Sequence, residues 1–364
     1  MNKANNQKEK PLVIVGLSGG VDSSVTAALL LEQGYEVIGV FMKNWSANTQ
    51  GCCSTDQDLA DARNVAQLLN IPFYVWNFEH QYAEKVMNYF FAEYQAGRTP
   101  NPDVMCNKEI KFKLFLERAL MMGADYIATG HYARNVFNQE TKTYSLLRGI
   151  DDSKDQSYFL CTLGQKELSH SLFPIGEYKK TVVRKLAEKF KLPTAKKKDS
   201  QGICFIGNIN VKKFLQENIK SIAGDIIDTD EKIVGQHDGA VYYTLGQREG
   251  LDIRNGQGPY YVVDKNIEKN QIIVTTDPQD PLLWKKEFTI SNLNMVNQEN
   301  KWPNEADVQI CYGHPAHKAK LEKTNEDKIT ITFDQPQRAI TPGQLAAIYQ
   351  QDELIGCGTI TDVR

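Results

Sequence analysis

Two cysteines stand in surroundings where a thiol could do chemistry. Cys106 follows Asp103 by three residues in NPDVMCN, between a proline-containing loop and a strongly periodic helical pattern. Cys204 lies in DSQGICFIG, after the basic run Lys196–Lys198 in a loop that follows Pro193. A thiolate is a nucleophile, but a lone cysteine is most often a small buried apolar residue. The residues themselves leave a reactive thiol and a core cysteine both open at each position.

A glycine-rich turn forms a second group that could do chemistry. Between a strand and a helix it reads Gly16, Leu17, Ser18, Gly19, Gly20, Val21, Asp22 and Ser23. Adjacent glycines let the backbone approach an anion, and their N–H groups with the helix N-terminus supply positive potential without a lysine. The turn matches neither GxxxxGK[ST] nor GxGxxG. Asp22 and Ser23 could be helix caps only, but the strand-to-helix context favours a phosphate site.

The elements that must position these residues alternate apolar strands with amphipathic helices. We expect strands at 11–17, 36–42, 72–78 and 124–132, and helices from Asp22, near 56–69, near 80–96, after NPDVMCN, and around 155–163 and 178–190. This alternation predicts an α/β fold with a doubly wound parallel sheet.

The composition changes after about residue 210, and from Gly224 the chain reads as short β-rich segments separated by turns. A second set of such segments begins near Trp284 and is typical of a small terminal β-barrel. We therefore expect three domains: a catalytic α/β domain at 1–210, a central mainly β linker domain at 211–282 and a C-terminal β-barrel at 283–364.

Length and composition describe an ordinary globular protein. The 364 residues are 41% hydrophobic and 24% charged, with a net charge of −3, so a nucleic-acid partner would need a local basic surface. No apolar run approaches membrane-spanning length, and MNKANNQKEK lacks a secretory signal's apolar segment. These features predict a cytoplasmic protein with no membrane association.

The seven cysteines are expected to be thiols in a reducing compartment, unless two of them do redox chemistry. They include no CxxC pair and no metal-finger spacing, so the sequence predicts no metal site built from the protein alone. Cys161 and Cys357 lie in apolar patterns that favour core packing. The role of the adjacent pair Cys52-Cys53 does not follow from the sequence.

A basic region precedes Cys204 and is opposed within its span only by Glu188. It contains Lys179, Lys180, Arg184, Lys185, Lys189, Lys191, Lys196, Lys197 and Lys198. Its helical part fits a solvated helix face as well as an RNA-binding face, whereas Lys196–Lys198 in the loop favour a phosphate backbone.

Several motifs together resemble known families. The turn GLSGGVDSS resembles the SGGxDS loop of the ATP pyrophosphatases, or PP-loop superfamily, whose members cleave ATP between the α and β phosphates to adenylate a substrate. The full set resembles the bacterial tRNA-specific 2-thiouridylases, which put sulfur on the wobble uridine (U34) of certain tRNAs. The motifs span about residues 16 to 344 and are GLSGGVDSS, VFMKNW, NPDVMCNKEIKF, ATGHYAR, KDQSYFL, DSQGICFIG, YTLGQREGL and TPGQ.

The resemblance implies a division of labour among the motifs. ATP, with Mg²⁺ on its phosphates, would bind Gly16, Leu17, Ser18, Gly19, Gly20, Val21, Asp22, Ser23, Met42 and Gly130. Cys204 would carry the sulfur as a persulfide received from a cysteine desulfurase or a sulfur-relay protein. Cys106 would reduce that persulfide or assist its transfer, leaving a Cys106–Cys204 disulfide, and Asp103 would be the general acid or base.

The resemblance also implies tRNA contacts. They would be made by Asn101, Pro102, Asp103, His131, Lys154, Asp155, Gln156, Cys311, Tyr312 and Gln344. Cys311 departs from the family pattern, in which an arginine precedes the tyrosine, so one phosphate contact is lost there. Tyr312 could still stack on a base.

Two other functions explain part of the pattern. A different PP-loop synthetase that adenylates a small molecule accounts for SGGVDSS but leaves Cys106 and Cys204 without a role. A non-catalytic RNA-binding protein with a vestigial loop is the second alternative. AMP and pyrophosphate release that depends on tRNA and on a persulfide donor discriminates among the three.

Overall fold

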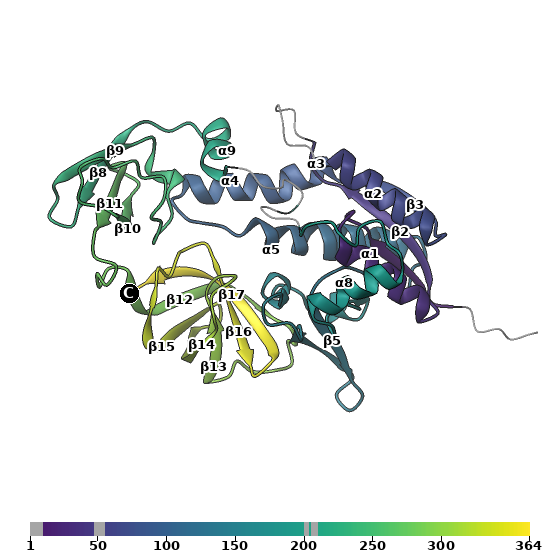
Figure 1. The fold of residues 1–364 in the computed structure, drawn as a ribbon. Coiled ribbons are helices and arrows are strands. Elements are labelled where there is room, and N and C mark those ends of the chain that lie inside the picture. The colour runs from purple at the N-terminus through teal and green to yellow at the C-terminus, as the bar shows by residue number, and fades with distance from the viewer. Residues whose placement is uncertain (1–9, 47–54, 200–203, 205–209) are drawn as a thin grey trace, which may run out of the picture. The chain divides into compact units, whose positions relative to one another are not determined.

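The computed structural model describes residues 10–46, 55–199, 204 and 210–364 (Figure 1). Within these residues the chain packs as two compact units. The first contains Met1–Tyr82 and Cys106–Asn208, and the second contains Ala83–Met105 and Ile209–Arg364. The expected domain boundaries after residues 210 and 282 stay a prediction, while the packing assigns the segment 83–105 to the second unit.

A five-stranded parallel sheet forms the centre of the first unit. Its spatial order is β3 (Phe73–Asn77), β2 (Glu36–Lys43), β1 (Leu12–Gly16), β4 (Tyr126–Ala128) and β7 (Ser171–Leu172). The strand order reverses at β1, because β2 and β3 lie on one side of it and β4 and β7 on the other. Ligands of open α/β sheets bind at such a switch point, beyond the carboxyl ends of the strands.

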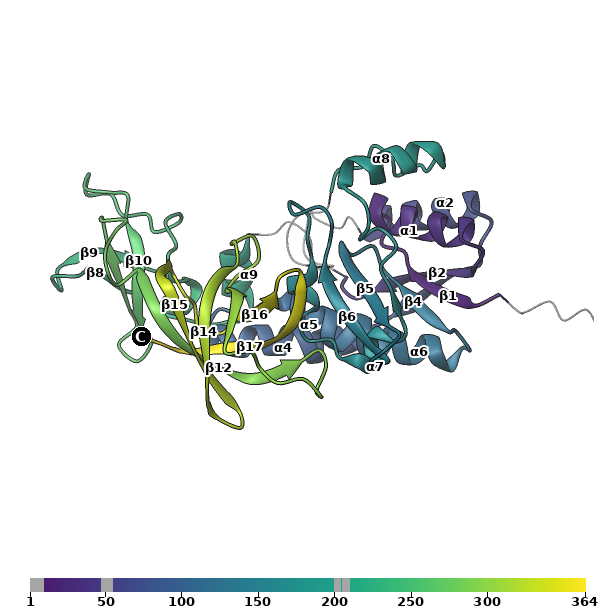
Figure 2. The ribbon, with the colours of Figure 1, turned by 90° about the horizontal axis from the view of Figure 1, so that it is seen from below.

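Helices cover both faces of this sheet (Figure 2). On one face lie α1 (Val21–Glu32), α2 (Thr55–Leu68) and α8 (Lys180–Lys189), and α6 (Leu116–Met121) lies on the other. The buried core joins strand residues such as Val13 and Val15 to Val25 of α1 and Val183 of α8. The expected doubly wound α/β fold is confirmed.

The remaining helices and strands before residue 210 are short. They are α3 (Glu79–Tyr82), the π-helical η1 (Ala83–Met87), α4 (Asn88–Gln95), α5 (Pro102–Cys106), the π-helical η2 (Asn107–Phe115), β5 (Ala133–Asn138), β6 (Thr143–Arg148), the 3₁₀ helix η3 (Ser157–Leu160) and α7 (Gln165–Leu168). The apolar pattern at 155–163 therefore forms only one 3₁₀ turn. Tyr158, Leu160, Cys161 and Leu163 are all buried, so the pattern reflects burial on several sides and not a helical stripe.

The second unit contains two β modules. The first has α9 (Val211–Asn218), the 3₁₀ helix η4 (Ala240–Tyr242) and a sheet of order β10 (Tyr261–Asn266), β11 (Gln271–Thr275), β8 (Gly224–Asp228) and β9 (Ile233–His237). The second is an antiparallel barrel of order β12 (Trp284–Met295), β15 (Lys328–Arg338), β14 (His317–Asn325), β13 (Glu305–Gln309), β16 (Leu345–Gln350) and β17 (Glu353–Val363). Pairing of β12 with β17 closes this barrel, as the sequence predicts.

Apolar side chains fill the barrel, among them Phe288, Ile331, Ile348 and Ile360, all at most 1% exposed. Within the described part of the chain, no helix has the length and apolar character that crossing a membrane requires.

Candidate active site

The glycine turn lies where the sheet topology predicts a ligand. It connects the end of β1 at Gly16 to α1, and Gly20 is the N-cap of that helix. Among the described residues no side chain caps α1, so the N–H groups of its first turn point out of the helix without an intrahelical partner. Gly19 has φ +76°, and a Cβ there would collide with the backbone of Asp58. The conformation at Gly19 therefore requires glycine. The turn and the α1 N-terminus together have the geometry of an anion-binding site, which we call the cradle.

Serine hydroxyls hold the cradle in shape. Ser23 Oγ accepts from the Ser18 N–H at 3.1 Å and lies 3.1 Å from Ser18 Oγ, and Ser24 Oγ donates to the Gly20 carbonyl at 2.7 Å. Ser18 itself is exposed. The side chains of Leu17 and Val21 are 1% and 3% exposed and belong to the core. These two residues can therefore offer a ligand only their backbone groups.

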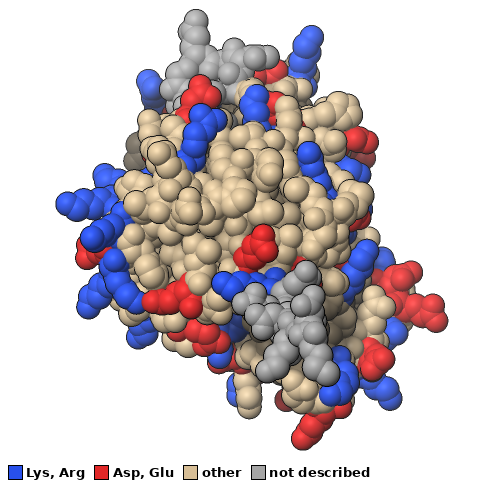
Figure 3. Space-filling view, turned by 90° about the vertical axis from the view of Figure 1, so that its right-hand side faces the viewer, with Lys and Arg blue, Asp and Glu red and all other residues tan. Residues whose placement is uncertain are grey.

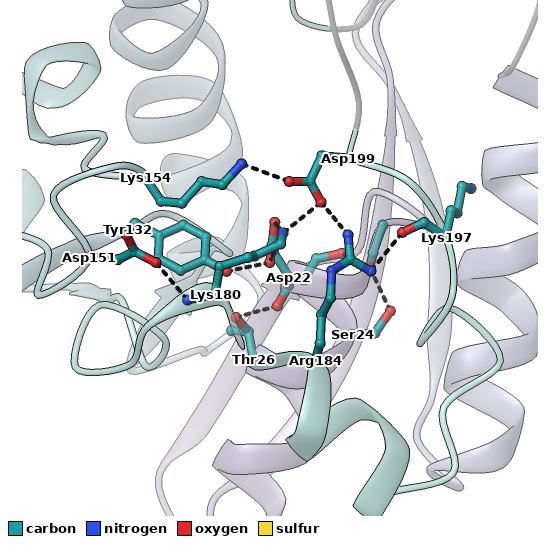
Figure 4. Close-up of polar contacts among 12 residues, drawn as sticks. Asp22, Ser24, Thr26, Tyr132, Asp151, Lys154, Lys180, Arg184, Lys197 and Asp199 are labelled. Atoms are coloured by element: carbon teal, nitrogen blue, oxygen red, sulfur yellow. Dashed lines mark hydrogen bonds and ion pairs between the residues drawn. The ribbon is translucent and has the colours of Figure 1, made fainter. Parts of the chain in front are cut away.

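Asp22 connects the cradle to distant parts of the unit (Figure 4). Lys180 Nζ of α8 lies 2.8 Å from each Asp22 carboxylate oxygen, and the Tyr132 hydroxyl donates to one of them at 2.7 Å. Burial, reinforced by the negative Asp22, raises the pKa of Tyr132, so the phenol remains a hydrogen-bond donor. The Lys180 side chain is only 10% exposed, which makes this a fixed and not a fluctuating surface pair.

Asp199 forms ion pairs with three basic side chains beside Asp22, as Figure 4 shows. Its oxygens lie 2.8 Å from Lys180 Nζ, 2.9 Å from Lys154 Nζ and 2.7 Å from Arg184 Nη2. Burial by itself would raise the pKa of Asp199, but the hydrogen bonds and charges of Lys180 and Lys154 outweigh it and lower the pKa to about 2. Lys180 thus bridges two carboxylates, one in the phosphate cradle and one five residues before Cys204.

Two further predicted ATP ligands border the cradle. Met42, near the end of β2, is 7% exposed, and a Cβ at Gly16 would lie 3.0 Å from its Cε. A Cβ at Gly130 would lie 2.8 Å from the Ser23 N–H nitrogen and 2.9 Å from the Asp22 carbonyl carbon. Gly130 is therefore glycine because the backbone after β4 approaches the start of α1 closely.

A buried side-chain amide, that of Asn44, lies just after the end of β2 and two residues after Met42. Asn44 is 0% exposed, and among the described residues neither its Nδ2 nor its Oδ1 has a hydrogen-bond partner. An unsatisfied buried amide is costly, and such groups are commonly found at functional sites. Sequence reasoning missed Asn44 because an asparagine after a strand is usually a turn residue.

The two candidate thiols both belong to the first unit, but their surroundings differ. Cys106 ends α5 and is fully buried, whereas Cys204 is partly exposed. The hydroxyl of Tyr82, at the end of α3, donates to the Cys204 carbonyl at 2.8 Å. Tyr82 is itself fully buried and packs edge-on against Trp45, with ring centroids 6.3 Å apart. A rigid aromatic group therefore holds the backbone of Cys204.

Asp103 lies in the second unit, in the first turn of α5. Asn101 Oδ1 accepts from the N–H groups of Asp103 and Val104, both at 3.1 Å, so Asn101 is the cap that starts this helix. The predicted tRNA ligand Gln344 also belongs to the second unit, where its Nε2 donates to the carbonyls of Thr99 at 2.9 Å and Pro100 at 3.2 Å.

The predicted contact segment Lys154-Asp155-Gln156 is strongly bonded within the first unit. Asp155 accepts from Arg148 Nη1 at 2.9 Å, from the Gly149 and Ser157 N–H groups at 3.0 Å, and from Ser157 Oγ at 2.9 Å. Gln156 bonds Tyr132 twice, through its N–H and its Oε1. Asp155 and Gln156 thus shape the loop. The side chain of Lys154, which pairs with Asp199, is more exposed than that of Asp155.

His131 is buried, with 8% of its surface exposed. Its Nδ1 lies 2.7 Å from Thr129 Oγ1 and its Nε2 3.5 Å from Lys111 Nζ. Burial, with a smaller contribution from the positive Lys111, lowers the pKa of His131 well below its usual value. The imidazole is therefore neutral at physiological pH and cannot act as a cationic phosphate ligand in this arrangement.

Much of the predicted basic region is engaged in ion pairs inside the first unit. Besides the pairs of Lys180 and Arg184, Lys189 pairs with Glu32, and Lys197 pairs with Asp58 and Asp61 of α2. Figure 3 accordingly shows basic and acidic side chains interspersed around a broad surface without charged groups. Of the run Lys196–Lys198, Lys197 therefore fixes the segment before Cys204 to α2.

The remaining candidates lie in the barrel or outside the described residues. Cys311 follows β13, and burial raises the pKa of its thiol. Tyr312 is 40% exposed, as stacking on a base would need. Cys161 and Cys357 are 0% and 1% exposed, which confirms their assignment to the core. Cys52 and Cys53 lie outside the described residues.

Sequence reasoning missed the charged cluster around the cradle. Lys180 was one basic residue among nine, and nothing in the spacing of 158 residues links it to Asp22. The same holds for Asp199, Tyr132 and Tyr82. Among the described residues no group of three or more His, Cys, Asp and Glu side chains is placed to hold a metal ion.

Three family models match successive parts of the chain. They are described as the tRNA methyl transferase HUP domain, at residues 11–208, the tRNA methyl transferase PRC-barrel domain, at 212–276, and the aminomethyltransferase beta-barrel domain, at 285–360.

Curated relatives are similar over their whole length. The tRNA-specific 2-thiouridylase MnmA of Bacillus subtilis (strain 168) is 48% identical over 358 residues, which are 98% of this chain and 96% of that protein. The protein of the same name from Shouchella clausii (strain KSM-K16) is 48% identical over 359 residues, 98% of each chain.

Solved structures show weaker similarity. The U34-tRNA thiolase NcsA from Methanococcus maripaludis is 20% identical, with 54% of this chain and 63% of that chain covered and a TM-score of 0.35. The NMN synthetase from Francisella tularensis is 21% identical, with 54% and 71% covered and the same TM-score. The family models and the curated relatives, and not these two structures, decide the assignment.

Proposed function

Because the chain belongs to the family of tRNA-specific 2-thiouridylases, we propose that it replaces the C2 oxygen of the wobble uridine, U34, in tRNA by sulfur. It is a tRNA-uridine 2-sulfurtransferase that uses ATP and forms AMP. The family model's description mentions methyl transfer, but the full-length relatives are named for thiolation. An ATP-binding cradle combined with two thiols supports thiolation. We infer a cytoplasmic location, because tRNA is the proposed substrate.

The first step prepares a poor leaving group. A carbonyl oxygen at C2 does not leave readily, so it is converted to an adenylate, and AMP departs in its place. The residues of the cradle from Gly16 to Ser23 bind the phosphates through backbone N–H groups and the α1 N-terminus. Met42 and Gly130 border the nucleotide. Mg²⁺ would lie on the phosphates and would supply charge neutralisation there. Asp22 is not placed to hold it in this arrangement, because both of its carboxylate oxygens are bonded to Lys180 Nζ.

The second step transfers sulfur. Cys204 receives a sulfur atom as a persulfide from a desulfurase or relay protein. The Cys106 thiolate attacks the inner sulfur of that persulfide, so the persulfide bond breaks and a Cys106–Cys204 disulfide forms. The outer sulfur keeps the electron pair of the broken bond and displaces AMP at C2 of uridine. A thiol reductant then reopens the disulfide with two electrons and two protons.

Asp103 provides the proton transfer that this chemistry needs. A free cysteine has a pKa of about 8.5, so only a small fraction is thiolate near neutrality and a base assists. Asp103 precedes Cys106 by three residues on α5. Disulfide formation requires the two cysteine Cα atoms to come within roughly 7 Å, so Cys106 and Cys204 must converge in the RNA-bound state.

The proposed tRNA contacts are those of the resemblance except at Gln344, whose amide nitrogen bonds two carbonyls of the chain itself. The geometry supports a division of roles among the others. Lys154 and Tyr312 are exposed enough to meet RNA directly, and Cys311 adjoins Tyr312. Asn101 and Pro102 begin the helix that carries Asp103. His131, Asp155 and Gln156 shape the surface that RNA would meet. The wobble base already lies in a single-stranded loop, so its extrusion costs little.

One observation supports this proposal most directly. The N-terminus of α1, which follows Gly19 and Gly20, has no side-chain cap, and Asp22 in its first turn is bonded by Lys180. The test of the proposal is the release of AMP and pyrophosphate from ATP by the purified protein. We expect sustained release of both products only when tRNA and a persulfide donor are both present, because the adenylate formed on tRNA alone cannot turn over without sulfur. Release with ammonia or free amino acids instead would favour a small-molecule synthetase, and tRNA binding without any release would favour a non-catalytic RNA-binding protein.

A further inference from the structure

The turn at Thr341–Gln344 is hydrogen-bonded to Thr99 and Pro100, which precede α5. Gln344 Nε2 donates to the carbonyls of Thr99 and Pro100, immediately before the helix cap Asn101. We propose that Gln344 is a positioning residue that fixes where α5 begins and thereby where Asp103 stands. This inference rests on the proposed function, in which Asp103 moves a proton.

The hydrogen bonds that the Gln344 side chain donates favour a positioning role and not a contact with RNA. A side-chain amide nitrogen carries two hydrogens, and both carbonyl bonds of Gln344 come from that atom. No hydrogen is then left for a phosphate or a base. Among the described residues the Oε1 atom of Gln344 is buried and accepts no hydrogen bond. The side chain therefore works in this structure as a donor to the chain itself.

The barrel presents this donor on a rigid turn. Gly343 has φ +93°, and its N–H donates to the Ile360 carbonyl at 2.9 Å, while the Ile360 N–H donates to the Gln344 carbonyl at 2.8 Å. The turn also touches the segment directly. A Cβ at Gly343 would lie 2.9 Å from the nitrogen of Thr99, and that N–H donates to the Pro342 carbonyl at 2.9 Å. Three hydrogen bonds and a close glycine contact thus join the turn to Thr99 and Pro100.

The other β module holds the same segment from its own side. Thr244 Oγ1 lies 3.2 Å from Thr99 Oγ1, and Gly97, with φ +75°, packs so closely on Ile267 that a Cβ would lie 2.5 Å from Cγ1 of that residue. The two residues that follow Pro100 are the start of α5, where Asn101 Oδ1 accepts from two helical N–H groups. Both β modules therefore set the start of the helix that carries the proposed acid or base.

The test compares Gln344→Met, which keeps the shape but removes the donor, with Gln309→Met. Gln309 is a matched control because it lies in the same barrel, is 7% exposed and donates one amide hydrogen bond, to the His314 carbonyl at 2.9 Å. Hydrogen exchange of the backbone amides of Thr99, Asn101, Asp103 and Val104 is measured by mass spectrometry in the full-length protein without RNA. The turnover of tRNA thiolation and the tRNA dissociation constant are measured alongside.

We expect Gln344→Met to exchange these amides roughly 2–10-fold faster, the factor for one net hydrogen bond, and to lower turnover while the dissociation constant changes less than about twofold. Gln309→Met should leave their exchange unchanged. Gln344→Glu, which turns a carboxylate oxygen toward two carbonyls, should accelerate exchange at least as much.

Unchanged exchange with weaker tRNA binding would overturn the inference and make Gln344 an RNA contact. Faster exchange with unchanged turnover would also overturn it, because the helix start would then not matter for chemistry. Wild-type protein that does not thiolate tRNA would contradict the proposed function instead, and the exchange difference, measured without RNA, would tell the two failures apart.

Discussion

Lys180 Nζ lies 2.8 Å from both carboxylate oxygens of Asp22, although 158 residues separate the two along the chain. The same ammonium group lies 2.8 Å from Asp199. One cation therefore ties the phosphate cradle to the segment that precedes Cys204. In the proposed function, adenylation and sulfur transfer take place in these two parts of the chain. A change at Lys180 should therefore affect both steps.

Replacing Lys180 by methionine should impair adenylation. Asp22 and Asp199 would lose their shared cation, and the uncompensated Asp22 would repel the phosphates of ATP. We expect tRNA-dependent AMP release to fall at least roughly tenfold and the free energy of unfolding to fall by about 1–3 kcal/mol. Lys185→Met is the control, since Lys185 is an exposed lysine on the same helix. Equal losses in both variants would show that only the charge of α8 matters.

Replacing Gly19 by alanine should abolish ATP binding. The new Cβ would meet both a positive φ and the backbone of Asp58. Gly34→Ala separates the two effects, because Gly34 has φ +90° but nothing within 4 Å of a Cβ. That control should lose only about 1 kcal/mol of stability and keep ATP binding. Isothermal titration with ATP measures the difference, and ATP binding retained by Gly19→Ala would contradict the cradle.

Replacing Tyr82 by phenylalanine should loosen Cys204. The variant keeps the buried ring against Trp45 but loses the hydroxyl that bonds the Cys204 carbonyl. Alkylation of Cys204 by iodoacetamide, followed by peptide mass spectrometry, should become roughly 2–10-fold faster. Tyr242→Phe is the control, since Tyr242 is also buried and donates to a backbone carbonyl, that of Ile219. The same alkylation rate in Tyr82→Phe and wild type would rule out an anchoring role.

His131 should make stability depend on pH. Burial keeps its folded pKa well below 6.5, so below pH 6.5 the unfolded chain binds a proton that the native protein does not. The free energy of unfolding in urea should therefore decrease as the pH falls below 6.5, by at most about 1.4 kcal/mol per pH unit from this group. His131→Gln should flatten the slope, and His80→Gln, at an exposed site, should leave it. A slope unaffected by His131→Gln would mean that the ring is solvated.

Sequence patterns predicted the elements of this fold because their signals are local. The alternation of strands and helices before residue 200 and the β-rich segments after Trp284 each depend on burial within a few residues. The apolar segment at 155–163 shows the limit. It is buried on several sides around Tyr158, and periodicity cannot distinguish such burial from a helix.

The sequence predicted the contiguous part of the site but not the contacts between residues that are far apart in the chain. The glycine turn is a contiguous motif whose backbone geometry follows from residue type, as Gly19 shows. The pairing of Asp22 with Lys180, the anchoring of Cys204 by Tyr82 and the bond from Gln344 to Thr99 join residues far apart in the chain. Contacts of this kind depend on how whole elements pack, and no spacing rule encodes them.

Two thiols, Cys106 and Cys204, are proposed to carry the sulfur to tRNA. The most direct measurement is the 2-thiouridine content of tRNA, by mass spectrometry of nucleosides, after reaction with ATP, a persulfide donor and a thiol reductant. Wild type and Cys357→Ser, a variant of a buried barrel cysteine, should produce 2-thiouridine. Cys106→Ser and Cys204→Ser should each produce none above background. Thiolation at the wild-type rate by either of these two variants would contradict the mechanism.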